Sequence, residues 1–80
     1  MKYVYLLESI SNPDKHYVGI SRDLTRHLAE HNNGKSPHTA RFRPWKVAIT
    51  VQFADEQKAA AFEKYLKSGS GHAFAKRHFW

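Results

Sequence analysis

The chain has 80 residues, a length that suits one compact domain close to the smallest size that a hydrophobic core stabilises unaided. It contains no cysteine, which excludes disulfide bonds and thiolate metal sites and fits a reducing cytoplasm. No apolar run approaches the roughly 20 residues of a membrane span, and no signal-peptide pattern is present. We therefore expect a single cytoplasmic domain over residues 1–80 with no membrane partner.

The net charge of +6 is unevenly distributed. Residues 31–54 and 64–80 contain no acidic side chain at all. The basic residues in these two segments are Lys35, Arg41, Arg43, Lys46, Lys64, Lys67, Lys76 and Arg77. Clustered positive charge is typical of a protein that binds a polyanion, although a solvated basic surface explains the charge equally well.

The first half of the chain predicts a hairpin and a helix. Residues 2–8 are rich in strand-forming residues and predict the first strand. A turn over residues 9–14 connects it to a second strand over residues 16–20. Ser21 is a candidate N-cap for a helix that runs to about Asn32, and Asn33-Gly34 ends it. Residues 35–44 form a basic loop.

The second half predicts one strand and two helices. Residues 45–53 are mostly apolar and form the third strand. Asp55 caps a helix that continues to about Ser68, residues 69–71 interrupt the chain, and a last helix covers residues 72–78. The order β-β-α-β-α-α favours an α+β fold, a small three-stranded, mainly antiparallel sheet flanked by helices.

A carboxylate borders the apolar stripe of the helix after Asp55. Ala59, Phe62 and Leu66 make up this stripe, and Glu63 lies beside it. Burying a carboxylate is costly unless it is paired or binds a metal ion. Glu63 therefore either holds a metal ion or turns outward, to solvent or to Lys67 four residues later.

Two histidines lie on the predicted buried side of the first helix. His27 and His31 share this side with Leu24 and Leu28, so both can face the sheet. They are either hydrogen-bonded core residues or, at i, i+4 spacing, a pair of metal ligands. A transition-metal site made of His27, His31 and Glu63 is a weaker alternative.

Three tyrosines lie on the first two strands. Tyr3 and Tyr5 share one face of their strand, and Tyr17 lies on the next. Such pairs usually pack across strands, and a phenol with a pKa of about 10 is a poor base unless cations favour the phenolate.

Together these features resemble the GIY-YIG nuclease superfamily, specifically its small stand-alone bacterial members. The segments that carry the resemblance are Tyr3-Val4-Tyr5, Tyr17-Val18-Gly19, Ile20 to Leu24, Leu28 to Asn32, Lys35 to Thr39 and Phe62 to Lys67. They occur in the family's order and cover essentially the whole chain.

The resemblance implies an endonuclease that hydrolyses DNA phosphodiester bonds with a single Mg²⁺ or Mn²⁺ ion and no small-molecule cofactor. Tyr5 and Tyr17 would orient or deprotonate the attacking water, Glu63 would hold the metal ion, and Gly19 would form a structural turn. His31 is a further catalytic candidate. A role in DNA repair or restriction, as a monomer or homodimer, is in keeping with the family.

One position departs from the family pattern. The family's phosphate-binding arginine follows the second-motif glycine by eight residues, and this position holds His27. Arg26 is adjacent but points about 100° away around the helix. Either His27 binds the phosphate, Arg26 replaces it, or the domain is a nucleic-acid-binding module on a degenerate nuclease scaffold.

Further residues are predicted to contact DNA through their charge or hydrogen-bond donors. They are Arg22, Lys35, His38, Arg41, Arg43, Lys67, Lys76 and Arg77. The family's usual C-terminal asparagine has no match in this chain, and Ser70 and His72 lie in the region where it is expected.

Overall fold

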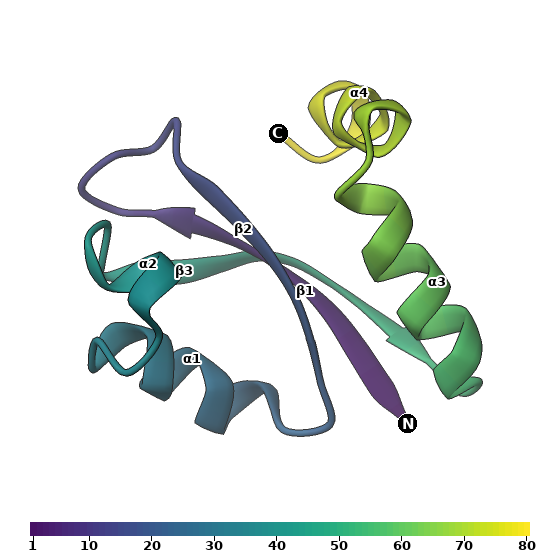
Figure 1. Cartoon of the computed structure of the whole chain (residues 1–80), viewed down its shortest axis with the longest axis horizontal. Coiled ribbons are helices and arrows are strands. Elements are labelled where there is room, and N and C mark those ends of the chain that lie inside the picture. The colour runs from purple at the N-terminus through teal and green to yellow at the C-terminus, as the bar shows by residue number, and fades with distance from the viewer.

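An antiparallel sheet of three strands organises the chain, and the computed structural model describes all 80 residues of it (Figure 1). The strands are β1 (Lys2–Ser9), β2 (His16–Ser21) and β3 (Trp45–Phe53). Their order in the sheet is β2-β1-β3, so β1 pairs with both neighbours and β2 has one free edge. The predicted hairpin of the first two strands is confirmed.

Four helices complete the fold. They are α1 (Leu24–Asn32), α2 (Pro37–Ala40), α3 (Glu56–Leu66) and α4 (Gly69–His78). The α+β class is confirmed, but the observed order β-β-α-α-β-α-α contains one helix more than predicted. The additional helix, α2, lies within the predicted basic loop, where Pro37 occupies the first turn that favours proline. No helix combines the length and the apolar character that crossing a bilayer requires.

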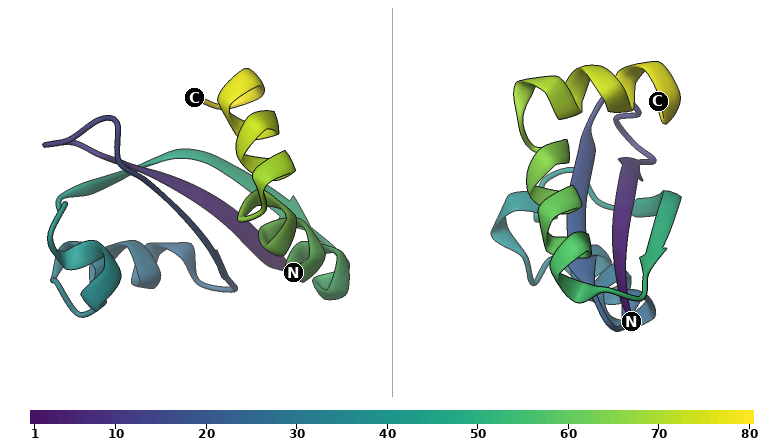
Figure 2. Two further views of the ribbon diagram at one scale, coloured as in Figure 1. Left: turned by 45° about the horizontal axis from the view of Figure 1, so that its top comes forward. Right: turned by 90° about the vertical axis from the view of Figure 1, so that its right-hand side faces the viewer.

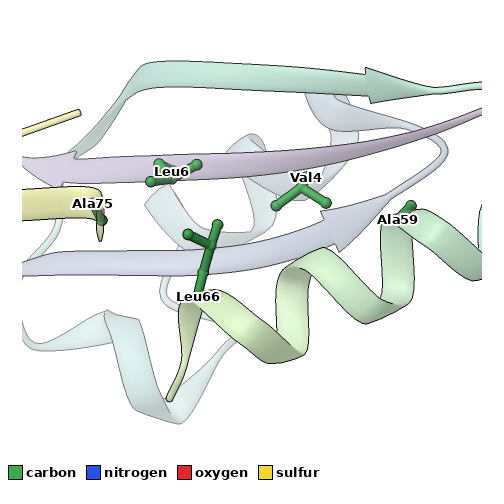
Figure 3. Close-up of a cluster of buried hydrophobic side chains, with 5 residues drawn as sticks. All are labelled: Val4, Leu6, Ala59, Leu66 and Ala75. Carbon is green, nitrogen blue, oxygen red and sulfur yellow. The ribbon is translucent and has the colours of Figure 1, made fainter. Parts of the chain in front are cut away.

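The alternation of β1 side chains produces two separate buried clusters. Val4 and Leu6 pack on one face with Leu66 of α3 and with Ala59 and Ala75 (Figure 3). The other face carries Tyr5, Leu7 and Trp45, against which the leucines of α1 pack. Figure 2 shows the strands between α1 and α2 on one side and α3 and α4 on the other. This arrangement puts α1 and α3 on either side of the free edge of β2.

The start of α1 lies two residues later than predicted. Asp23, not Ser21, is the N-cap, and its side chain accepts a hydrogen bond from the Arg26 backbone N–H. Ser21 belongs to β2, and its hydroxyl oxygen accepts from the Asp23 N–H at 2.8 Å. The predicted end is confirmed, because Asn33 is the C-cap and Gly34 follows it with a φ of +76°.

The prediction that residues 69–71 interrupt the chain is wrong, because these residues form the first turn of α4. Helix α3 ends at Leu66, and α4 already begins at Gly69, with the Ser68 side chain capping the Gly71 N–H. Gly71 is needed for packing, because a Cβ there would lie 1.8 Å from the Tyr65 carbonyl oxygen. The glycine therefore forms the tight corner between α3 and α4.

Hydrogen bonds fasten the end of α1 and the segment around α2 to the start of β3. The Asn32 side chain donates to the Trp45 carbonyl oxygen at 3.1 Å and accepts from its backbone N–H at 2.6 Å. The Trp45 indole N–H donates to the Thr39 carbonyl oxygen at 2.8 Å. These bonds hold Thr39, which is fully buried, against the C-terminal turn of α1.

Candidate active site

A pocket of about 430 Å³ lies at the free edge of β2, between α1 and α3. Ten residues line it: Tyr5, Tyr17, Gly19, Ile20, His27, Glu30, His31, Lys35, Ser36 and Glu63. They come from β1, β2, α1, the segment after α1, and α3. The pocket thus combines residues that are far apart in the chain.

Most of the residues predicted to be catalytic meet in this pocket. Tyr5, Tyr17, His27, His31 and Glu63 all line it. The rings of Tyr5 and Tyr17 have centroids 6.5 Å apart, and the Tyr17 ring lies 4.9 Å from that of His31. The remaining catalytic candidate, Arg26, is exposed and does not line the pocket.

Gly19 has a different role from the predicted structural turn. It lies inside β2, directly opposite Tyr5 in the register, and the strand continues to Ser21. A Cβ at position 19 would lie 2.3 Å from both the Tyr5 Cζ and its phenol oxygen. The absence of a side chain therefore leaves the space in which the phenol crosses beneath β2 and reaches the pocket at the sheet edge.

A chain of hydrogen bonds fixes the Tyr5 phenol. Its oxygen lies 3.1 Å from His31 Nε2, and His31 Nδ1 lies 2.7 Å from the Thr39 hydroxyl oxygen. The Thr39 hydroxyl has its own acceptor in the Ser36 carbonyl oxygen at 3.5 Å. We assign the imidazole N–H to Nδ1 on this basis, so that Nε2 accepts the Tyr5 proton.

His31 is therefore a hydrogen-bonded core histidine. It is buried, and this burial, reinforced by the nearby His27, lowers the pKa of His31 and favours its neutral form. Both ring nitrogens have partners, so neither is free for a metal ion. The weaker alternative of a transition-metal site at His27, His31 and Glu63 is wrong, because no three His, Asp or Glu side chains are gathered for one.

The environment of Tyr5 keeps its phenol protonated near neutral pH. Burial, followed by the negative potential of Tyr17, Glu63 and Glu30, raises the pKa of Tyr5 to about 12. Because the phenol proton points to His31, the oxygen retains lone pairs that can accept a further hydrogen bond. Tyr5 is thus built as a fixed acceptor, and only an added cation would favour its phenolate.

Glu63 combines features of both interpretations of the sequence. It lines the pocket with its side chain only 18% exposed, and it also forms an ion pair with Lys67 one helical turn later. The lysine ammonium additionally lies 5.9 Å from the centre of the Tyr17 ring. The pocket carboxylate is therefore held in place by a cation at its solvent side.

The donor set of the pocket fits a hydrated Mg²⁺ ion. Its candidate ligands are oxygen atoms, chiefly the Glu63 carboxylate with Glu30 and the two phenols nearby. Mg²⁺ keeps several of its waters and is commonly bound by one or two carboxylates together with substrate phosphates. Glu63 is the residue that would hold such an ion beside Tyr5 and Tyr17.

The predicted DNA contacts are spread over several surfaces. Lys35 lines the pocket, whereas Arg41 lies on the Phe42 ring and Arg43 donates to the Ala40 carbonyl oxygen. Arg22 forms a two-bond ion pair with Glu56, outside the pocket. Of the remaining candidates, His38 is exposed on α2, Lys67 and Lys76 line a second cavity, and Arg77 lines a third.

Three residues of the site were not anticipated. Glu30 and Ser36 line the pocket, and Thr39 holds His31 from behind. Glu30 follows His27 by three residues, a spacing that puts both on one helix face. This spacing could have identified Glu30 as a pocket residue from the sequence. No local pattern marks Thr39, because its contact depends on how α2 folds back onto α1.

Comparison with known proteins gives a consistent family assignment. The family model described as the GIY-YIG catalytic domain matches residues 1–77. The chain is 33% identical over 82 aligned residues to the structure-specific endonuclease subunit SLX1 of Debaryomyces hansenii, which covers 94% of this chain and 22% of that protein. It is 36% identical over 66 residues to a UPF0213 protein of Streptococcus pneumoniae serotype 4, covering 81% of this chain and 65% of the relative. The chain thus spans about a fifth of the yeast relative and about two thirds of the bacterial one.

Proposed function

Because this chain belongs to the GIY-YIG catalytic-domain family, we propose that it is a divalent-metal-dependent DNA endonuclease whose active site is the pocket beside Gly19. The observation that carries the proposal is the meeting of Tyr5, Tyr17 and Glu63 in this pocket. They come from β1, β2 and α3, and residue 63 is far from the two tyrosines in the chain. Packing alone does not require two phenols and a carboxylate at one sheet edge.

The chain's own residues have distinct tasks in this proposal. The fixed Tyr5 phenol accepts a hydrogen bond from the attacking water, and Tyr17 orients the water from the adjacent strand. Glu63 would hold the Mg²⁺ or Mn²⁺ ion, which would supply Lewis-acid stabilisation of negative charge on the phosphate and the leaving oxygen. Lys67 keeps the carboxylate aimed at the pocket.

The phosphate-binding cation is the least usual part of the site. No arginine lines the pocket, and the positions that can meet a phosphate are His27 and Lys35. A lysine carries its charge at neutral pH, whereas a histidine is only partly protonated there and cannot offer arginine's fork of donors. This observation also favours the second candidate function, a nucleic-acid-binding module with weak or no cleavage.

Replacing His27 with arginine tests this position. We expect His27→Arg to raise the cleavage rate by about tenfold or more, because the guanidinium offers the phosphate a fork of donors that imidazole lacks. The measurement is a single-turnover cleavage rate from pH 6 to pH 9. His27→Ala cutting as well as the parent at every pH would mean that position 27 only packs.

The basic residues around α2 allow a separate test of DNA binding. Neutralising Lys35, Arg41 and Arg43 together should weaken binding and reduce its salt dependence by roughly one unit of slope per lost phosphate contact. Affinity is measured at several salt concentrations without divalent metal. A control variant removes three charges from other elements, at Lys2 on β1, Lys46 on β3 and Lys58 on α3. If DNA affinity depends on salt equally in the two variants, Lys35, Arg41 and Arg43 are ordinary surface charges.

A substrate panel tests the proposed function itself. Single-stranded, duplex and branched DNA of matched sequence are each incubated with the purified protein in Mg²⁺, Mn²⁺ or EDTA. Branched DNA is included because the yeast relatives are named structure-specific endonucleases. We expect cleavage of at least one substrate with metal and none in EDTA. Binding without cleavage under all conditions would instead support the binding module.

A further inference from the structure

The largest cavity of the protein lies outside the active-site pocket. It has a volume of about 870 Å³ and is bounded by the first residues of β2, the end of α3 and one side of α4. The lining of this α4 groove includes Asp14, His16, Tyr17, Lys67, Lys76 and Trp80. The right-hand view of Figure 2 shows α4 crossing this end of the sheet.

The α4 groove adjoins the active site directly. Tyr17 lines both cavities, and Lys67 of the groove is paired with Glu63 of the active-site pocket. His16 and Gly19 are three residues apart on β2, so the two sites are separated by about 10 Å along the strand. A strand in duplex DNA advances about 3.4 Å per nucleotide. Both sites are therefore within reach of a few consecutive nucleotides.

The groove combines flat aromatic rings with positive charge. The exposed His16 imidazole is stacked on the Trp80 indole, with centroids 3.6 Å apart and an angle of 2° between the planes. The ammonium groups of Lys67 and Lys76 belong to the same lining, and Asp14 is its one acidic residue. Nothing in the active-site chemistry described above uses the His16–Trp80 stack.

We propose that the α4 groove binds an unpaired nucleotide of the DNA strand that is cut, an inference that rests on the proposed nuclease function. Stacked aromatic rings beside lysines are the combination with which proteins hold single-stranded nucleic acid, the rings contacting the bases and the lysines the phosphates. A paired base within a duplex keeps its faces covered by its neighbours and cannot extend the His16–Trp80 stack. The groove thus selects DNA that is single-stranded beside the cut.

Binding measurements on two variants of one helix test the proposal. Lys76 lines the groove, whereas the next residue, Arg77, lines a different cavity, so Lys76→Gln and Arg77→Gln remove the same charge from different surfaces of α4. The probes are a labelled single-stranded oligothymidine and a duplex of equal length, in EDTA to prevent cleavage. We expect Lys76→Gln to weaken single-strand binding about fivefold at 0.1 M salt and Arg77→Gln to weaken it much less.

Removal of the exposed ring tests the stacking contact. His16→Ala should lower affinity for oligothymidine at least about fivefold, and should not change affinity for an oligomer of abasic nucleotides, which keeps the phosphates but lacks the bases. His78→Ala, which removes an exposed imidazole on the other side of α4, is the control. Equal losses for thymidine and abasic oligomers would overturn base stacking in the groove.

Tryptophan fluorescence gives a second readout, because Trp80 lines the groove. Trp80 is partly exposed, whereas Trp45 is only 4% exposed. Oligothymidine should quench the emission, the duplex should not, and Trp80→Phe should abolish the quenching. Quenching that persists in Trp80→Phe would contradict the proposal.

These measurements also separate the groove from the proposed nuclease activity, because none of them requires cleavage. Selective loss of single-strand binding in Lys76→Gln and His16→Ala supports the groove even if no DNA is cut. Metal-dependent cleavage together with unchanged single-strand binding in both variants would contradict nucleotide binding in the α4 groove but not the nuclease proposal. Equal loss of single-strand and duplex binding would show a general phosphate contact and overturn the selection for unpaired DNA.

Discussion

Replacing Glu63 with glutamine is expected to abolish DNA cleavage while the protein keeps its fold. The amide has nearly the same shape as the carboxylate, so packing beside Phe62 and Leu66 is retained. It carries no charge for a divalent cation, and the loss should exceed the roughly 10–100-fold cost of removing a group that merely supports a metal ligand. The measurement is the single-turnover cleavage rate at saturating Mg²⁺, with circular dichroism to check the fold.

A matched control for this variant exists on the same helix. Glu56→Gln makes the same chemical change in the first turn of α3, where the carboxylate pairs with Arg22 outside the pocket. This ion pair lowers the pKa of Glu56 and lies at the surface, so its loss should leave cleavage unaffected. Parental cleavage by Glu63→Gln would exclude residue 63 as the metal ligand.

Replacing Gly19 with alanine is the second change with a large expected effect. Alanine is compatible with a strand, but its Cβ would occupy the space of the Tyr5 phenol, 2.3 Å from the phenol oxygen. The ring must move, and the hydrogen bond to His31 is lost with it. A misplacement of about 1 Å in an active site can cost about a hundredfold in rate, which is the loss we expect.

The effect of Gly19→Ala on activity can be separated from an effect on stability. Gly69→Ala is the control, since a Cβ at that position meets no atom within 4 Å. Thermal unfolding reports the stability of both variants, and the imidazole nitrogen NMR signals of His31 report its bond to Tyr5. A Gly19→Ala protein that cuts at the parental rate would show that the fixed phenol is unimportant.

The strands and the main helix faces could be predicted from the sequence because their signals are local. Alternation in β1 sends Val4 and Tyr5 to opposite faces, and the stripe of α3 places Ala59 and Leu66 against the sheet. Glu63 could be found as a polar residue bordering that stripe. Its importance was still ambiguous, because the same position also allows the ion pair with Lys67 that is observed.

The errors arose where neighbouring elements decide the outcome. The sequence alone predicts a turn at Gly19, whereas its role depends on the register that places Tyr5 opposite it. Ser21 and Asp23 both suit a helix N-cap, and pairing of Ser21 with Tyr3 in the sheet leaves the cap to Asp23. Thr39 could not be predicted, because only the folding of α2 against α1 brings its hydroxyl to His31.

The position of the site explains how so small a domain assembles it. Tyr5 comes from the central strand and Tyr17 from the edge strand, while Glu63 approaches from the helix on the other face. Gly19 leaves room for the Tyr5 phenol to reach this edge, because a Cβ at position 19 would lie 2.3 Å from the phenol oxygen. The free edge of β2 thus becomes the place where both layers contribute to one pocket.

Paramagnetic Mn²⁺ provides the most direct test of the claim that this pocket is the metal site of a metal-dependent nuclease. The ion is titrated into isotope-labelled protein, and the loss of backbone amide NMR signals is mapped along the chain. We expect signals around Gly19 and Glu63 to disappear first and to persist in Glu63→Gln. Broadening centred on the histidines of α4, or an unchanged pattern in Glu63→Gln, would contradict the claim.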